Sequence, residues 1–267
     1  MKTNNFFDFR RFGRLLAADF RLNGKRYLFF ALGALVGIYL IDIFSIINIY
    51  NMPFDDSLGT YIYMPVYSAI FFLSMLIIYA FAGSSFPAFS DKNESASYLL
   101  LPASHFEKFL AQFVIYIAGG IVMLFIFFWI DIHLARLTVA PFKNFPITPF
   151  SYKEMFIDFI KEDKSNFVLI LISTAVGIFL FSVRLFFGKY ALTKGVASLF
   201  GFIFLLFCLL CLFTQIFYPK TANWEVYVFD YRINGIHVMS ILMGFFALVV
   251  ILFSLPIAYY KLKDKHL

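Results

Sequence analysis

The chain has 267 residues and a formal net charge of +6; 62% of its residues are hydrophobic, 22% aromatic and only 14% charged. A soluble domain of this length has too little interior to bury so much apolar surface, and its 40 phenylalanines would cover the exterior. Apolar runs of about 20 residues, the length that crosses a bilayer, recur along the chain. Because lipid offers the backbone no hydrogen bonds, such runs must be helices. The composition therefore excludes a soluble protein and predicts an all-α integral membrane protein.

The first predicted element is an amphipathic helix within residues 5–24. Phe9 and Phe20 belong to an aromatic face at 100° per residue, whereas Arg10, Arg14 and Arg21 cluster on another face. Aromatic rings on one side and arginines on the other are typical of a helix that lies at anionic lipid headgroups. We therefore predict an interfacial helix anchored by these five residues, and the alternative is a helix packed on protein.

Six membrane-spanning helices follow in the predicted topology. They are expected at Leu28–Ile49, Tyr61–Gly83, Phe109–Ile132, Phe167–Phe187, Val196–Phe217 and Ile236–Tyr260. If the N-terminus is cytoplasmic, 15 of the 22 Lys and Arg residues fall on the cytoplasmic side. The pattern predicts one transmembrane domain over residues 1–267, in the cell (inner) membrane, with both termini cytoplasmic.

The second and third spans are joined by a polar connector, residues 84–108. Ser90 or Asp91 can begin a short helix with Glu94 at the capping-box position, and Pro102 ends it. Ser104-x-x-Glu107 is a second capping box that starts the helix leading into the third span. A return loop needs only a few residues, so a kinked helical connector suits the docking of a soluble partner. A merely structured turn is the alternative.

The largest predicted extracytoplasmic loop, residues 136–164, contains an amphipathic helix at residues 151–162. Ser151-x-x-Glu154 is a capping box, and the apolar positions after it follow helical spacing. This helix is predicted to lie flat on the membrane or over the mouth of a pathway. In residues 218–235, between the last two spans, aromatic residues alternate with other residues, a pattern more typical of a β-hairpin than of a helix.

Three ionisable residues lie in or near the ends of spans. Arg184 is expected to reach the cytoplasmic headgroups, and Asp131 the outer interface. Asp42 lies about 21 Å into the first span, where a lipid-facing carboxylate would cost a few kcal/mol. It is therefore a candidate for lining a pathway, and pairing with Arg136 or a protonated structural role are the alternatives.

Motifs for chemistry are missing from the chain. It contains no phosphate-binding G-x-x-x-x-G-K-[ST] loop, no H-E-x-x-H and no G-x-S-x-G. Cys208 and Cys211 lie inside an apolar span, where small buried or lipid-facing residues are expected rather than a redox pair. We expect no catalytic residue, no metal, no cofactor and no nucleic-acid partner for this chain.

The chain resembles type-2 ABC exporter permeases in three features: the amphipathic N-terminal helix, the six spans and the string "LPASHFEKF" (101–109). A second string, "FFGKYALTKG" (186–195), is similar to a basic cytoplasmic turn of some bacterial members. The resemblance implies that residues 5–24 form an elbow helix and residues 91–101 a coupling helix. A separate cytoplasmic ABC ATPase would then carry ATP and Mg²⁺, and a second permease copy or paralogue would complete the pathway. The implied partner-binding residues are Glu94, Tyr98, Leu99, Glu107 and Lys108.

One departure from that family concerns the outer gate. The family usually places two re-entrant helices between spans five and six, whereas here the larger outer loop lies between spans three and four. The leading hypothesis is the permease subunit of an ABC-type exporter. The alternatives are an ion-coupled carrier that uses Asp42, a non-transporting membrane scaffold subunit and, least favoured because its motifs are missing, an intramembrane enzyme.

Overall fold

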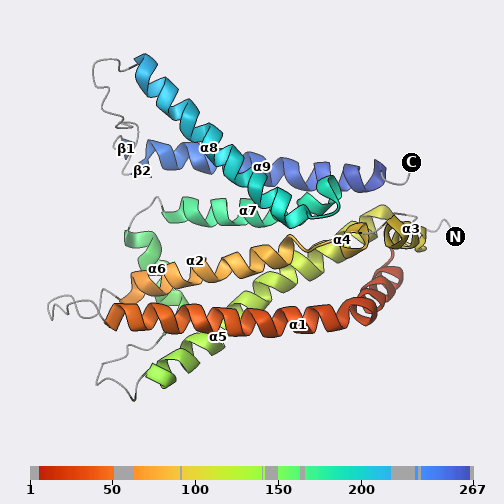
Figure 1. The fold of residues 1–267 in the computed structure, drawn as a ribbon, viewed down its shortest axis with the longest axis horizontal. Coiled ribbons are helices and arrows are strands. Elements are labelled where there is room, and N and C mark those ends of the chain that lie inside the picture. Colours follow the sequence, from red (N-terminus) through yellow and green to blue (C-terminus); the bar gives the residue numbers. More distant parts are fainter. Residues whose placement is uncertain are drawn as a thin grey trace.

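The computed structural model describes residues 6–50, 63–90, 92–139, 141, 150–162, 166–217, 232–233 and 236–264. Within these ranges the chain is helical apart from turns and one pair of very short strands (Figure 1). The long helices are α1 (Phe9–Tyr50), α2 (Tyr63–Ala82), α5 (Gly119–Val139), α7 (Asn166–Phe187), α8 (Ala191–Phe217) and α9 (Val238–Asp264). The shorter ones are α3 (Lys92–Leu100), α4 (His105–Phe113) and α6 (Tyr152–Glu162). The prediction of an all-helical fold is confirmed at this level.

Among the described residues, five helices are long and apolar enough to cross a membrane. They lie within Phe9–Asn48, His105–Val139, Asn166–Phe187, Ala191–Leu209 and Ser240–Asp264. The second of these joins α4 to α5 through a π-helical turn, η3 (Val114–Ala118). A further apolar helix, α2, has 20 residues and thus a length of about 30 Å, close to the thickness of the hydrocarbon core. A sixth span at α2 stays a prediction.

The separate N-terminal helix that the sequence predicted is not seen. α1 runs from Phe9 to Tyr50 as one 42-residue helix, and Figure 1 shows it turning near its N-terminal end. The carboxylate of Asp19 bridges the expected junction, because it accepts hydrogen bonds from Asn23 Nδ2 at 2.7 Å and from the Tyr27 hydroxyl at 2.6 Å. A single glycine between the two segments, Gly24, costs only about 1 kcal/mol and does not break the helix.

The bundle is organised around two helix pairs. α7 packs most extensively against α9, and α1 against α5, while α2 touches α1, α5 and α7 and so links the two pairs. In Figure 1 the start of α1 and the end of α9 lie at the end of the bundle where α3 and α4 are found. Both described chain ends thus share one end of the molecule with the connector, which we call the connector end.

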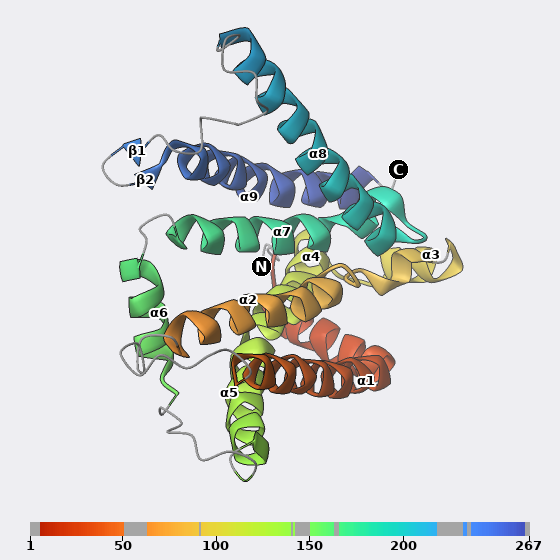
Figure 2. The same cartoon turned by 60° about the vertical axis from the view of Figure 1, so that its left-hand side comes forward.

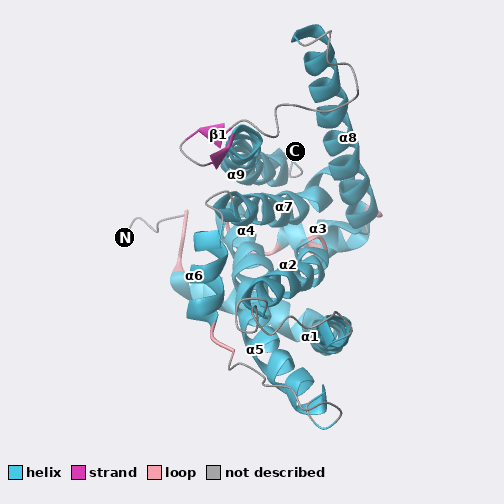
Figure 3. Cartoon of the chain, turned by 90° about the vertical axis from the view of Figure 1, so that its left-hand side faces the viewer, coloured by secondary structure: helices cyan, strands magenta, loops and turns pink. Residues whose placement is uncertain are grey.

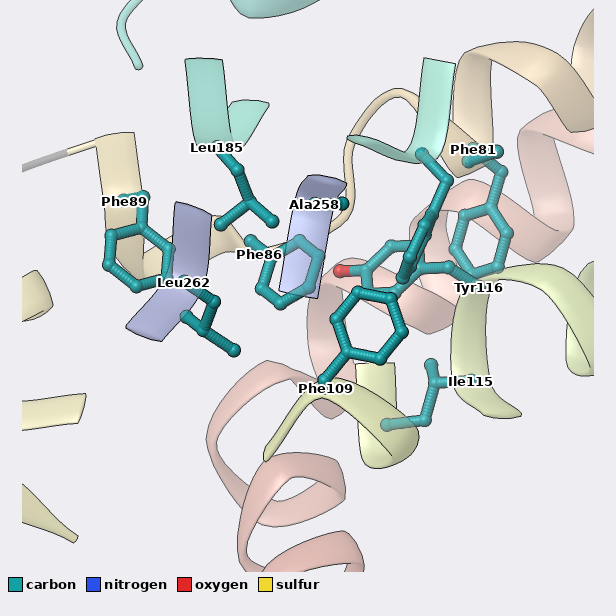
Figure 4. Packing of buried hydrophobic residues seen from close by; sticks show 11 residues of the cluster. Phe81, Phe86, Phe89, Phe109, Ile115, Tyr116, Leu185, Ala258 and Leu262 are labelled. Carbon is teal, nitrogen blue, oxygen red and sulfur yellow. The ribbon is translucent and has the colours of Figure 1, made fainter. Parts of the chain in front are cut away.

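Each end of the bundle has its own aromatic core. At the connector end, Phe86, Phe109, Tyr116 and Phe181 pack with small and aliphatic residues of α7 and α9, and Figure 4 shows this cluster at close range. The second cluster is centred on Phe71 and Phe128 and includes Ile38, Ile132, Phe150 and Met155. Through Met155, α6 packs on α2, so this predicted interfacial helix covers the end of the bundle opposite the connector.

α8 diverges from the bundle. Gly188, with φ of +59°, ends α7 in the left-handed conformation and donates its N–H to the Arg184 carbonyl at 3.0 Å, a common helix C-cap. After this turn the first part of α8 packs on α7. The rest of α8 diverges from the bundle, as Figures 2 and 3 show from two sides. Most of its phenylalanines are exposed, as suits a helix that faces lipid.

A short hairpin is described at the end of the interval where the sequence predicts one. β1 (Arg232–Ile233) pairs antiparallel with β2 (Ile236–His237), directly before α9. The rest of the interval between α8 and β1, residues 218–231, lies outside the described residues, as do residues 142–149 of the other predicted outer loop.

The contact between α7 and α8 depends on Gly195. A Cβ atom there would lie 2.7 and 2.8 Å from the two methyl groups of the buried Val183, whereas one at Gly201 on the same helix would meet nothing within 4 Å. Alanine raises helix propensity equally at both positions. We therefore expect Gly195→Ala to lower the free energy of unfolding by about 1–2 kcal/mol, through overpacking, and Gly201→Ala to leave it unchanged or higher. Thermal unfolding in detergent measures both; equal effects would contradict the packing described.

Candidate functional site

The connector between α2 and α4 consists of a turn, the 3₁₀ segment η2 (Pro87–Ser90), α3 and a proline-containing bend. The bend ends at Ser104, whose hydroxyl accepts a hydrogen bond from the Glu107 backbone N–H at 3.1 Å. In return, the Ser104 N–H donates to Glu107 Oε2 at 2.8 Å. The predicted capping box at the start of α4 is confirmed in both of its hydrogen bonds.

Glu107 also ties α4 to the beginning of α1. Its side chain is 0% exposed and forms an ion pair with Arg11, in which Nε and Nη2 each approach a carboxylate oxygen at 2.8 Å. The Asp8 backbone N–H donates to the same carboxylate at 2.7 Å. This fork of charge-assisted hydrogen bonds satisfies a carboxylate that would otherwise be costly to bury.

Lys108, 1% exposed, holds the other side of the connector. Its ammonium donates to the Leu99 carbonyl at 2.6 Å, at the C-terminal end of α3, where the helix dipole favours a positive charge. The Tyr98 hydroxyl donates back to the Lys108 carbonyl at 3.3 Å, and its ring centroid lies 5.9 Å from the ammonium nitrogen. α3 is therefore closed onto α4 by two reciprocal contacts.

A third anchor runs through Gln112 of α4. Its Nε2 donates to Asp19 Oδ2 at 2.6 Å, and its Oε1 accepts the backbone N–H of Phe86 at 2.9 Å. Phe86 has a φ of +51°, unusual for a bulky residue, and is buried in the aromatic core. The hydrogen bond to Gln112 thus holds the first residues of the connector in a conformation that the backbone alone disfavours.

The end of α2 is held by contacts from two other helices. The Ser84 carbonyl accepts long contacts of 3.5 Å from Arg26 Nη2 of α1 and from Arg184 Nη1 of α7. The Ser85 hydroxyl donates to the Phe181 carbonyl at 2.5 Å. Arginines near a helix C-terminus complement its dipole. The beginning of the connector is therefore bound to α1 and α7, and its end to α1 and α4.

A cavity of about 510 Å³ lies between α1 and the connector. Its polar atoms come from Asp19, Asn23 and Gln112, which hydrogen-bond to one another, so the acid in its wall is already satisfied. The remaining lining residues are largely apolar: Leu15, Ala18, Leu22, Phe86, Pro87, Ala88, Tyr98 and Leu101.

The residues predicted to bind a partner fall into two groups. Glu107 and Lys108 are buried against their own chain, and Tyr98 and Leu99 are half-buried, while the side chain of Glu94 is not described. In this chain, Glu107 and Lys108 therefore fix the connector, and whether the connector binds a partner stays a prediction. Among the described connector residues, Leu100 is a large apolar side chain that is 82% exposed, and sequence reasoning did not single it out.

The predicted lipid anchors lie on the outer face of α1. Phe9 and Phe20 are exposed, as are Arg10, Arg14 and Arg21. The opposite face carries Arg11, Leu15 and Asp19, which contact the connector region. The segment thus packs on protein along one face, as the alternative reading expects, and contact of the other face with lipid headgroups stays a prediction.

Asp42, the predicted pathway residue, is 0% exposed, and neither of its carboxylate oxygens has a hydrogen-bond partner among the described residues. The suggested pairing with Arg136 is therefore not formed. Asp131 was expected at the outer interface, but it is also 0% exposed. The expectation was wrong because α5 continues to Val139, two turns beyond the predicted end of the span.

No cluster of three or more His, Cys, Asp or Glu side chains that could hold a metal ion is found in the described part of the chain. His133 packs against the ring of Trp129 at 4.8 Å between centroids. Comparison with protein-family models, with curated proteins and with solved structures finds no match.

The ion pair between Arg11 and Glu107 can be measured by a double-mutant cycle. Arg11→Met leaves a buried carboxylate without its cation and should lower the free energy of unfolding by about 2–4 kcal/mol. Glu107→Gln should have a similar effect, and the double variant should lose much less than the sum of the two. Thermal unfolding in detergent gives the three values, and additive losses would show that the two side chains do not interact.

Proposed function

We propose that the chain is the membrane-spanning permease subunit of an ABC-type exporter, driven by a separate cytoplasmic ATPase and completed by a second copy or a paralogue. One observation carries the proposal: the connector is bound to three helices by buried polar contacts, while the C-terminal end of α3 is exposed. A connector of this kind suits the transmission of movement from a docked protein, because the connector cannot shift without moving the helices to which it is bound.

The contacts define the route that such a push would take. A shift of α3 acts on α4 through Lys108, and α4 acts on the start of α1 through Glu107. α4 is continuous with α5 through the π-helical turn η3, and α5 packs along α1. π-turns are common at functional positions of helices. Movement at the connector would thus reach the helix pair α1 and α5 over its whole length.

The side of the membrane follows from the basic residues. With both termini cytoplasmic, as the asymmetry of Lys and Arg indicates, the connector end faces the compartment that contains ATP. This chain has no phosphate-binding loop, so the nucleotide would be bound by the partner. Leu100 at the tip of α3 would then serve as an apolar anchor in a groove of the ATPase.

A photo-crosslinking amino acid at Leu100 tests the docking surface. The matched control is Leu137, also an exposed leucine (70%) but near the other end of the α4–α5 column. In native membranes, the probe at position 100 should form a covalent adduct with an ABC ATPase, identified by mass spectrometry, and the probe at position 137 should not. Equal capture at both positions, or none at 100, would refute the docking assignment.

The same contact can be tested by substitution. Leu100→Asp puts a charge on a side chain that is 82% exposed, so thermal stability should stay unchanged. The ATPase activity recovered with the purified protein in mild detergent should fall at least about tenfold, the equivalent of 1.4 kcal/mol of docking energy. Leu137→Asp should recover as much activity as the unmodified chain. Full recovery with Leu100→Asp would argue against an ATPase bound at α3.

A further inference from the structure

Four acidic residues are buried in the described part of the chain, and they differ in one respect. Asp19 and Glu107 accept hydrogen bonds from several side-chain and backbone donors. Asp42 and Asp131 are equally buried, each 0% exposed, but all four of their carboxylate oxygens are without a hydrogen-bond partner. Buried polar atoms are almost always paired, so two unpaired carboxylates in one region need an explanation.

The two acids belong to helices that pack along each other. Asp42 lies on α1 and Asp131 on α5, and the two carboxyl groups are close enough to interact electrostatically. Their surroundings are apolar: Ile38 lies one turn before Asp42, Phe128 and Ile132 flank Asp131 in sequence, and all three are fully buried in the second aromatic cluster.

The ionisable groups nearby use their hydrogen bonds elsewhere or act at a distance. Tyr152 of α6 lies near Asp42. Burial, and after it this acid, raises the pKa of the Tyr152 phenol, but the hydroxyl donates to the Phe125 carbonyl at 2.6 Å. On α5, His133 packs on Trp129, and Arg136 follows one turn after Asp131 and acts electrostatically on His133. From α2, the ring of Tyr67 packs on Phe150. None of these groups donates to either carboxylate.

Physical chemistry limits the charge that such a pair can hold. Moving one ionised carboxylate into apolar surroundings is so costly that the group binds a proton instead. Two carboxylates that interact cannot both be ionised without a cation between them. A protonated carboxyl group is neutral and therefore costs far less to bury than the anion.

We propose that Asp42 and Asp131 together form a proton-binding site between α1 and α5, which holds at least one proton at neutral pH. Release of that proton leaves repelling charges between two packed helices, so protonation favours the packed arrangement of α1 and α5. The site is independent of whether an ATPase docks at the connector.

Dicyclohexylcarbodiimide tests the site directly, because this apolar reagent forms stable adducts with protonated carboxyl groups in apolar surroundings. The full chain in mild detergent would be treated at neutral pH and its peptides analysed by mass spectrometry. We expect an adduct on Asp42 or Asp131 that declines in alkaline buffer. Asp19 is the matched control within the chain: it is buried but already accepts three side-chain hydrogen bonds, so it should carry no adduct.

Three results would overturn the proposal. The first is the absence of any adduct on Asp42 and Asp131 even in mildly acidic buffer. The second is labelling of Asp19 to the same extent, which would mean that the reagent does not select protonated groups here. The third is protection by NaCl but not by choline chloride at constant pH, which would identify the ligand as a metal cation.

A second measurement covers loss of labelling through misfolding. Asparagine has the shape of a protonated aspartate, so the variant Asp42→Asn, Asp131→Asn should fold and behave as the protonated site does. The native state of the unmodified chain binds a proton that the unfolded chain releases above a pH of about 4, so its stability should fall as the pH rises from there until the native site also releases its proton. The variant should lose clearly less stability over the same range. Equal losses would show that the pair holds no proton.

Discussion

The buried carboxylate of Glu107 organises the connector end of the molecule. It caps α4, pairs with Arg11 and accepts the Asp8 N–H, so one side chain determines where α4 begins and where α1 lies against it. Lys108 and Gln112 extend this arrangement to α3 and to the start of the connector. Without Glu107, the N-terminal part of α1 would lose its ion pair to α4.

The four buried acids divide the structure into two chemically different ends. At the connector end, Asp19 and Glu107 accept hydrogen bonds from donors of the protein in place of water, and such satisfied networks make a region rigid. At the other end, no donor among the described residues reaches Asp42 or Asp131, and the aromatic cluster around them excludes charge. The connector end therefore holds a rigid hydrogen-bonded network, whereas the opposite end holds a neutral pair of acids that can titrate.

The two ends are connected by the same pair of helical columns. α1 carries Arg11 and Asp19 at one end and Asp42 about 35 Å further along, at 1.5 Å per residue from Asp19. The column of α4, η3 and α5 carries Glu107 and Gln112 at one end and Asp131 at the other. Any change in the packing of α1 on α5 therefore affects both the polar contacts of the connector and the pair of acids Asp42 and Asp131.

Much of this fold could be read from local sequence. Long apolar runs located long helices, with α7 predicted to within one residue, because a chain that enters lipid must bond every backbone group of such a run within its own helix. Ser104-x-x-Glu107 located the start of α4 because a capping box involves only residues three apart. The amphipathic pattern of residues 151–162 likewise identified α6, since helical periodicity is a local property.

Contacts between distant residues could be decided only by tertiary structure. Arg11 and Glu107 are 96 positions apart, and Asp19 and Gln112 are 93 apart, so no local pattern predicts that they bind each other. The same holds for Lys108: the family resemblance suggested that it binds a partner, but in the fold it donates to the Leu99 carbonyl. It holds also for Asp131, which is buried near Asp42 because α5 is longer than predicted. Sequence periodicity tells which residues avoid water or lipid. Which group satisfies a buried charge depends on how the helices pack, and for that reason only the folded chain distinguishes an acid that stays ionised from one that holds a proton.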